Sequence, residues 1–279
     1  MNIVWRIVNF IVGLFKKKPV VEEQTTTTVA PTVEPTTTTV EPTTTTVEPE
    51  TNDENDEQIN EPITMKNVVV CLDNGHGNNT PGKCSPWSAC KVKPELEFRE
   101  YAYTRMLVQM IKPRLEALGY EVYVVVPEDT DITLGERCRR INAKVKEAKA
   151  RGKRTIMVSV HNNAAGNGRE WKEAYGWSVW TTRGQNNSDI LAQCMYDEAA
   201  KILKQHGQKT RHDTGDGDDD YEAGFYIING SNCPAVLVEN MFQDCIKEVQ
   251  WMLTEEGKDA LAEIHVKGID AFVKKMGWE

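Results

Sequence analysis

Three residues able to bind a metal ion or carry a proton each follow directly on an apolar, β-branched run: His76, His161 and Glu239. Short runs of this kind predict buried strands. Because helices cover both faces of an α/β sheet, ligands bind in the crevice outside the carboxyl ends of its strands. We therefore expect these three side chains to converge at one edge of a sheet.

Two imidazoles and one carboxylate could hold zinc and leave a fourth position for water. Zinc lowers the pKa of a bound water to ~7, and a further carboxylate can then act as a base. Glu100 borders the apolar stripe of a predicted helix near its start, which is unusual for a purely solvated carboxylate. The alternative is that Glu100 only stabilises the helix N-terminus, a role that Glu95 and Glu97 could fill equally well. The residues alone leave open which carboxylate is a ligand.

Two of the other three histidines have ordinary structural interpretations. His206 precedes Gly207 at a predicted helix end, where both residue types are common. His265 shares an apolar helical stripe and is expected to be packed. His212 lies in an acidic loop and is a candidate substrate contact.

The elements that must position these residues alternate between strand and helix. Strands are expected from Asn67 up to His76 and over 121–126, 155–160, 176–182 and 235–238. Helices are expected over 97–118, 132–151 and 188–206, and further helices follow up to Trp278. This order predicts a single α/β domain with a twisted, mixed and largely parallel β-sheet flanked by helices. Pro113 is expected to kink the first helix or to start a second segment. The basic residues of the second helix, Arg137 among them, are interpreted as a solvated face.

The first 62 of the 279 residues differ in composition from the rest, so the domain is expected over 63–279. Residues 19–62 repeat Thr-Thr-Thr-Thr-Val-Glu-Pro twice, continue into an acidic run and contain no aromatic residue, which predicts a disordered linker. Residues 1–18 are apolar around a narrow polar stripe, which indicates a membrane-associating segment too short for a spanning helix of ~20 residues. A cleaved signal peptide and a role away from membranes are the alternatives.

Net charge and cysteine spacing exclude several classes of protein. Without residues 1–62 the acidic residues fall from 42 to 31 and the basic residues from 33 to 29. A nearly neutral domain gives no electrostatic reason to expect nucleic acid binding. The seven cysteines lack paired CxxC spacing, so neither a zinc ribbon nor a disulfide framework is predicted.

Two stretches approach known ligand-binding loops without meeting their requirements. In the glycine-rich run 77–84, Cys84 stands where a phosphate-binding loop needs Ser or Thr to hold Mg²⁺, and Pro81 removes a backbone donor. The acidic loop 211–220 lacks the ligand spacing of an EF-hand. We expect no nucleotide site, and interpret the acidic loop as a flexible, substrate-facing segment.

Residues 66–276 resemble the zinc-dependent N-acetylmuramoyl-L-alanine amidases of the amidase 3 family. The likeness rests on Leu-Asp-Asn-Gly-His-Gly at 72–77, Ser-Val-His-Asn-Asn-Ala at 159–164, Val-Leu-Val-Glu-Asn at 236–240, and Glu100 nineteen residues before Gly119-Tyr120. Two departures concern substrate fit more than zinc chemistry. Asn74 replaces the family's Ala or Pro, and Asn240-Met241-Phe242 stands where the family has Gly-Phe after the glutamate.

The resemblance implies a peptidoglycan hydrolase that cleaves the amide between N-acetylmuramic acid and L-alanine. The residues it assigns are the zinc ligands His76, Glu100 and His161, the catalytic base Glu239, and the substrate contacts Asn163 and Arg211. The expected partner is peptidoglycan, and the expected oligomeric state is a monomer. The expected location is the cell envelope, membrane-tethered or exported, or the bacterial cytoplasm for a phage lysin. Another zinc peptidase of the cell wall and a non-catalytic peptidoglycan-binding module are alternatives.

Overall fold

The computed structural model describes residues 64–86, 93–215 and 217–279. The membrane-associating segment expected at 1–18 and the linker expected at 19–62 lie outside the described residues, as does Cys90. No helix in the described part of the chain is both long enough and apolar enough to cross a membrane.

The centre of the domain is a six-stranded sheet with the strand order β2-β1-β3-β6-β4-β5. The strands are β1 (Val68–Asn74), β2 (Glu121–Val124), β3 (Arg154–Asn163), β4 (Ser178–Thr181), β5 (Tyr221–Glu222) and β6 (Ala235–Phe242). Strand β4 runs antiparallel to β6, and all other neighbours in the sheet are parallel. The predicted mixed, largely parallel sheet is therefore confirmed.

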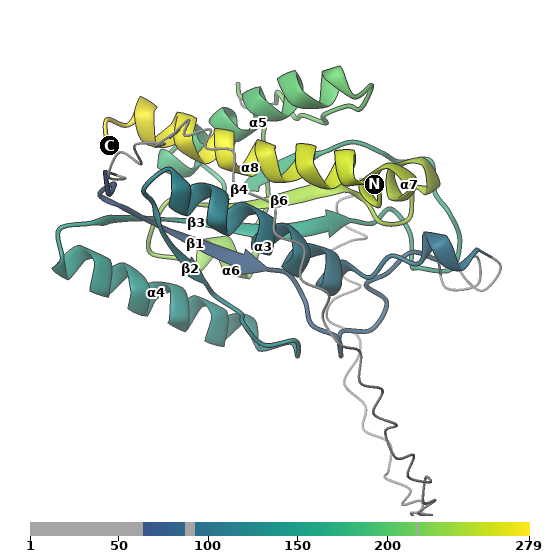
Figure 1. Ribbon diagram of the computed structural model, residues 1–279, viewed down its shortest axis with the longest axis horizontal. Helices are drawn as coiled ribbons and strands as arrows, with labels where there is room; N and C mark the ends of the chain where they lie inside the picture. The colour runs from purple at the N-terminus through teal and green to yellow at the C-terminus, as the bar shows by residue number, and fades with distance from the viewer. Residues whose placement is uncertain (1–63, 87–92, 216) are drawn as a thin grey trace, which may run out of the picture. The chain divides into compact units, whose positions relative to one another are not determined.

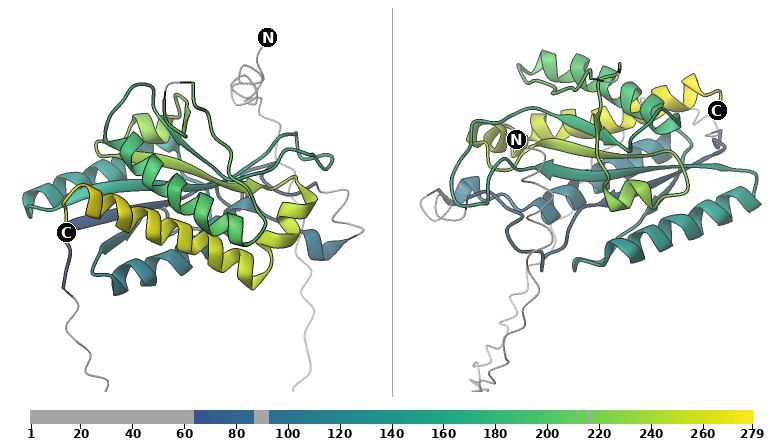
Figure 2. Two further views of the ribbon diagram at one scale, coloured as in Figure 1. Left: turned by 90° about the horizontal axis from the view of Figure 1, so that it is seen from above. Right: turned by 180° about the vertical axis from the view of Figure 1, so that it is seen from behind.

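Helices cover both faces of this sheet, as Figures 1 and 2 show. One face carries α3 (Glu100–Ala117), α5 (Asn187–Gln205) and α8 (Glu255–Lys275), and the other carries α4 (Leu134–Ala150) and α6 (Tyr226–Asn229). The other elements of the described residues are the short 3₁₀ helix η1 (Pro94–Leu96) and α7 (Ile246–Met252). The predicted α/β class is confirmed.

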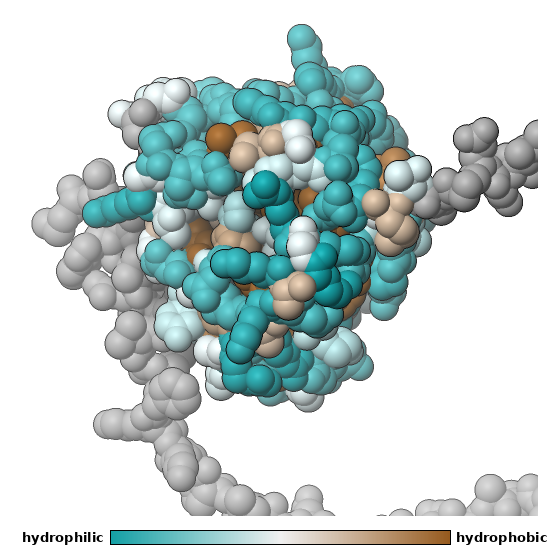
Figure 3. Space-filling view, turned by 90° about the vertical axis from the view of Figure 1, so that its left-hand side faces the viewer, coloured by the Kyte–Doolittle hydropathy of each residue, from teal (hydrophilic) through white to brown (hydrophobic). Residues whose placement is uncertain are grey.

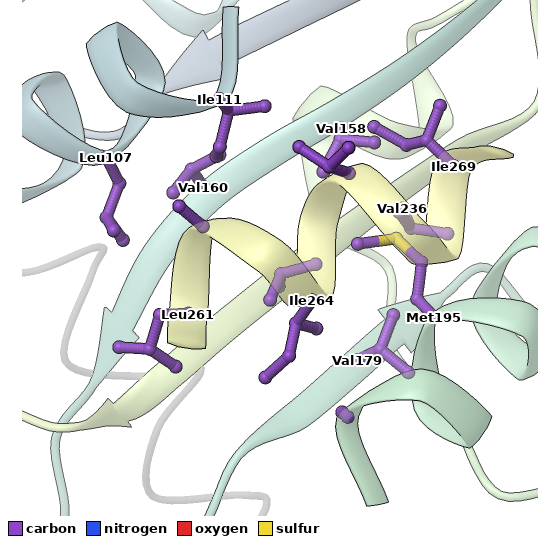
Figure 4. Close-up of a cluster of buried hydrophobic side chains, with 14 of the residues drawn as sticks. Leu107, Ile111, Val158, Val160, Val179, Met195, Val236, Leu261, Ile264 and Ile269 are labelled. Atoms are coloured by element: carbon purple, nitrogen blue, oxygen red, sulfur yellow. The ribbon is translucent and has the colours of Figure 1, made fainter. Parts of the chain in front are cut away.

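Alternating strand residues supply two separate cores. Val70 and Leu72 of β1 pack on the face of α3 and α8, whereas Cys71 between them packs on the face of α4. Figure 4 shows part of the larger core, in which Ile264 of α8 belongs to one buried cluster with Val158 of β3. Each fully buried side chain of this size contributes ~1.5–3 kcal/mol, so the strands that carry the site are held firmly on both faces. On the side of the molecule seen in Figure 3, hydrophilic residues predominate and apolar residues emerge only in small groups.

Four expectations about these elements are corrected. Helix α3 begins at Glu100 rather than residue 97, and it continues through Pro113 as one helix because the proline is exposed, where water can replace the lost hydrogen bond. Strands β3 and β6 are longer than predicted, because their ladder continues to the pair Asn163↔Phe242. Arg137 does not belong to a solvated face, since it is only 2% exposed.

Candidate metal centre and active site

His76, Glu100 and His161 converge beyond the end of β1. The Nε2 atom of His76 lies 3.4 Å from Glu100 Oε1, and the Nδ1 atom of His161 lies 3.1 Å from the same oxygen. The two imidazole rings meet edge to face with centroids 4.9 Å apart. One ligand atom from each residue lies within 4.8 Å of the other two, so the three side chains could hold a metal ion.

Glu100 is the first residue of α3 and is almost fully buried, with 1% of its surface exposed. Its Oε1 atom accepts the backbone N–H of Asn162 at 3.0 Å, and its Oε2 atom accepts an N–H of the Gln243 side chain at 3.1 Å. Burial alone would raise the pKa of Glu100, but His76 and His161 hold it well below the ordinary value. The carboxylate is therefore ionised and fixed in orientation, as a metal ligand must be.

The histidine loop after β1 needs its glycines. His76 has a positive φ of 61°, and a Cβ atom on Gly75 would lie 2.3 Å from the His161 ring. A Cβ atom on Gly77 would overlap the backbone of Asp131. Glycine at position 75 allows the loop to approach β3 closely enough for the two imidazoles to meet, and glycine at position 77 allows it to pack against the backbone of Asp131.

Two arginines that sequence reasoning missed hold this loop in place. The carbonyl oxygen of His76 accepts hydrogen bonds from Arg137 Nη2 at 3.2 Å and from Arg105 Nη2 at 3.1 Å. Arg137 also pairs with the buried Asp73 at 2.6 Å and with Asp131 at 2.8 Å. Their sequence context gave no signal, because Arg137 lies among other charged residues of α4 and Arg105 borders an apolar part of α3. Only the fold turns the two side chains toward the loop.

Glu239 lies beside this group on β6. It is the register partner of His161 on β3, and partners on adjacent strands are ~4.8 Å apart with side chains on the same face. Burial raises the pKa of Glu239 to about 7. The charge of His161 opposes this rise, the Glu100 carboxylate adds to it, and the charge of Lys83 opposes it weakly. The Oε2 atom of Glu239 has no hydrogen-bond partner in the described part of the chain.

Burial affects the protonation of the two histidines as well. It lowers the pKa of His76 below the ordinary value, despite the nearby Glu100 carboxylate. For His161 the effect of burial is outweighed by the hydrogen bond to Glu100, so its pKa is raised. A metal ion binds only neutral imidazoles. Metal binding would therefore remove the proton from His161, which the Glu100 carboxylate stabilises in the metal-free chain.

The structure places the two expected substrate contacts beside Phe242. Asn163 ends β3 and is the register partner of Phe242, and the Arg211 guanidinium lies over the Phe242 ring at 5.2 Å. Arg211 also lines a hollow of about 320 Å³ together with Tyr175. Neither Asn163 nor Arg211 hydrogen-bonds to the histidines or to Glu100 within the described ranges.

The remaining histidines are accounted for by structure. His206 caps α5, and His265 is fully buried with Nε2 3.1 Å from Asn240 Oδ1. The Asn240 side chain also donates to the carbonyl oxygen of His161 at 3.1 Å, so Asn240 supports the site rather than facing a substrate. His212 is exposed and lies 2.8 Å from the Tyr196 hydroxyl.

The residue pattern and the fold agree with one protein family. A model of the amidase 3 family, described as N-acetylmuramoyl-L-alanine amidase, matches residues 70–271. The chain belongs to this family. The matched region includes His76, Glu100, His161 and Glu239, so every residue of the candidate site lies within it.

Two curated relatives have the same kind of domain. The endolysin of Bacillus phage SPP1 is 29% identical over 203 residues, which covers 72% of this chain and 64% of the endolysin. The N-acetylmuramoyl-L-alanine amidase AmiC of Neisseria meningitidis serogroup B is 25% identical over 243 residues, covering 74% of this chain and 52% of AmiC. The chain thus spans 64% of the length of the endolysin and 52% of the length of AmiC.

Solved structures share the fold. An N-acetylmuramoyl-L-alanine amidase from Clostridium difficile 630 aligns with a TM-score of 0.60 at 24% identity, over 74% of this chain and 97% of its own. The catalytic domain of CwlV from Bacillus (Paenibacillus) polymyxa var. colistinus aligns with a TM-score of 0.57 at 20% identity, over 76% and 99%. The amidase family thus has the same α/β architecture as this chain.

Proposed function

We propose that this protein is a zinc-dependent N-acetylmuramoyl-L-alanine amidase, which hydrolyses the amide between the lactyl group of N-acetylmuramic acid and L-alanine in peptidoglycan. The observation that carries the proposal is the convergence of His76, Glu100 and His161 on one point, with Glu239 beside them. Two imidazoles and one carboxylate are a donor set that suits zinc and leaves room for water and substrate. Family membership supports the reaction class.

In the proposed hydrolysis the bound metal and Glu239 have different roles. Zinc, when bound, supplies Lewis acidity toward the scissile carbonyl and lowers the pKa of water. Glu239 accepts a proton from the attacking water, and then delivers it to the nitrogen of L-alanine as the C–N bond breaks. The products are a lactyl carboxylate and a free amine. Burial raises the pKa of Glu239 to about 7, and the positive charge of Lys83 opposes that rise and so favours the basic form.

Asn163 and Arg211 are proposed to orient the glycan or the stem peptide. Both adjoin Phe242, which follows Glu239 by three residues on β6. A guanidinium beside a hollow suits a peptide carboxylate. Substituting Arg211 with Met is expected to raise the KM for peptidoglycan fragments and to leave zinc content unchanged.

The domain organisation proposed for the whole chain is a membrane-associating segment at 1–18, a linker at 19–62 and the catalytic domain at 63–279. This arrangement suits an enzyme of the cell envelope that acts as a monomer, or a phage lysin made in the bacterial cytoplasm. Cosedimentation of the full chain with lipid vesicles tests the first segment. Binding that is lost in Phe10→Asp supports it, and equal binding of both chains contradicts it.

The bond that is cut distinguishes the amidase from its alternatives. After digestion of purified peptidoglycan with the full-length protein, a new amino terminus on L-alanine supports the proposal. A new terminus within the stem peptide would indicate another zinc peptidase of the wall. Binding to peptidoglycan without any new terminus would indicate a non-catalytic module.

Replacing the proposed base separates catalysis from metal binding. Glu239→Gln is expected to retain zinc and to lose at least ~100-fold in kcat, because general base catalysis typically contributes that much or more. Glu263→Gln, which removes a carboxylate on the surface of α8, is the control and is expected to keep full activity. Unchanged turnover in Glu239→Gln would remove Glu239 from the mechanism.

A further inference from the structure

A second group of carboxylates lies at the opposite end of β6 from the histidines. Asp189 from the first turn of α5 meets Asp218 and Asp220 from the loop before β5, and one carboxylate oxygen of each lies within 4.8 Å of the other two. Ser188, the neighbour of Asp189, accepts the backbone N–H of Ala235 at the start of β6. Glu239 is four residues further along that strand, or ~13 Å away at 3.3 Å per residue. The two groups are therefore separate.

The carboxylate of Asp220 is buried beside the Thr181 hydroxyl and the Asp218 carboxyl, but no positive charge balances it within the described residues. Asp220 is only 2% exposed, and neither of its carboxylate oxygens accepts a hydrogen bond of good geometry from a described residue. Asp189, at 4% exposure, is different, because its oxygens accept the Thr181 hydroxyl and the backbone N–H of Asn186. Neither Asp189 nor Asp220 forms an ion pair with a lysine or arginine of residues 64–86, 93–215 and 217–279. Buried polar groups are rarely unpaired, so a ligand that balances these charges is expected here.

Protons are the alternative way to neutralise the group. Burial, together with the neighbouring Asp218 carboxyl, raises the pKa of Asp220 to about 8. A chain without a bound cation would then carry a proton on Asp220 near neutral pH. A cation would replace that proton, since it is attracted by all three carboxylates at once.

We propose that Asp189, Asp218 and Asp220 form a calcium site. The available side-chain ligands are hard oxygen atoms, which Ca²⁺ prefers and which suit zinc less well than nitrogen or sulfur. Oxygens bound to one Ca²⁺ ion at ~2.4 Å can lie up to ~4.8 Å apart, so the observed separations accommodate a single ion. The spacing of acidic residues along the loop 211–220 could not predict this site, because one of the three ligands, Asp189, comes from α5.

The ion has a structural role. Strand β5 pairs with β4 at Trp180↔Tyr221 and Thr181↔Glu222, and Ala223 N–H donates to the carbonyl oxygen of Thr181, so the described contact between the two strands is short. A calcium ion at Asp218 and Asp220 anchors the strand and the preceding loop to α5. The same loop begins with Arg211, so calcium fixes the far end of the segment that carries this proposed substrate contact.

Calcium-dependent thermal unfolding of the zinc-loaded, full-length protein tests the proposal. Addition of CaCl₂ at about 100 times its Kd is expected to raise Tm by about 5–10 °C relative to NaCl at equal ionic strength. Tb³⁺, an oxygen-seeking ion that replaces Ca²⁺, gives a second readout. Its luminescence should be sensitised by Trp180, which stacks on Tyr221 at 4.7 Å, and should be quenched by added Ca²⁺.

Matched variants locate the ion. Asp220→Asn keeps the shape of the side chain and removes one charge, so it should lose both the calcium-dependent rise in Tm and the Tb³⁺ signal. Asp218→Asn should behave in the same way, and either variant suffices if the other does not fold. Asp213→Asn removes an exposed carboxylate of the same loop and should keep both responses. Absence of both responses in the wild type, their retention in Asp220→Asn, or their loss in Asp213→Asn would overturn the proposal.

Discussion

The guanidinium of Arg137 donates a hydrogen bond to the carbonyl oxygen of His76, with 3.2 Å between Nη2 and the oxygen. The same side chain forms an ion pair with Asp73 in which both partners are at most 2% exposed. The backbone of His76 has a positive φ, so this contact supports a conformation that a histidine rarely adopts. Arg137 therefore links the buried charge of β1 to the position of a proposed zinc ligand.

Arg137→Met is expected to weaken zinc binding by about 10–100-fold, because the loop that carries His76 loses its support. It should also lower the free energy of unfolding by about 3–5 kcal/mol, since Asp73 is left buried without its partner. Arg139→Met on the exposed side of α4 is the control. Competition with a metal-binding dye measures the affinity. A folded Arg137→Met protein with wild-type zinc affinity would contradict this role.

Gly75→Ala is expected to abolish zinc binding. The added Cβ atom would lie 2.3 Å from the His161 ring, so the loop or β3 must move and the imidazoles must separate. Gly135→Ala is the matched control, because a Cβ atom there has only the Tyr226 hydroxyl at 3.9 Å. Zinc content of the two purified variants provides the comparison, and normal content in Gly75→Ala would show that the close approach is not required.

Gln243→Met should reduce zinc affinity by about 10-fold while leaving the fold intact. Gln243 donates to Glu100 Oε2 at 3.1 Å, and its own Oε1 atom has no partner among the described residues. Methionine fills a similar volume but gives Glu100 no hydrogen bond. Gln193→Met, which removes an amide of α5, serves as the control. Equal zinc affinities in the two variants would show that the Gln243 contact does not tune the ligand.

His265 should make the fold less stable in mild acid. Burial lowers the pKa of His265 to about 3, below the value of about 6.5 expected in the unfolded chain. The unfolded chain therefore binds more protons between these values, and stability is lost as the pH falls below 6.5. Between pH 6.5 and 5 the expected loss from this residue is about 1.6 kcal/mol.

Urea unfolding of the wild type and of His265→Gln across this pH range checks the effect. Glutamine can keep a hydrogen bond to Asn240 but does not titrate. The variant should therefore have a lower baseline stability and a shallower decline toward pH 5. Parallel declines in the two proteins would mean that His265 is not the group responsible.

Sequence patterns predicted the longer strands and helices because hydrophobic periodicity follows burial directly. They did not predict β5 and α6, which are too short to show a period. The convergence of His76 and His161 could also be predicted, since parallel strands end at one edge of a sheet. The exact ends of β3 and β6 could not, because they depend on how far the two strands pair with each other. Glu100 was distinguished from Glu97 only by family resemblance, and the structure places Glu100 inside the domain.

Long-range polar contacts were beyond the sequence patterns. Arg137 lies in a helix rich in exposed charges, and only the packing of α4 against β1 shows that it is buried. Asp189 is separated from Asp220 by most of α5 and the loop that follows it, so no local spacing links them. Contacts of this kind follow from the fold as a whole.

The central claim is that His76, Glu100 and His161 bind one zinc ion on which hydrolysis depends. Its most direct test is the zinc content of the purified full-length protein, determined together with peptidoglycan cleavage for the wild type and Glu100→Gln. One zinc per chain and cleavage are expected in the wild type, with both lost in Glu100→Gln. A wild-type protein that cleaves peptidoglycan while free of metal, or a Glu100→Gln protein that keeps its zinc, would contradict the claim.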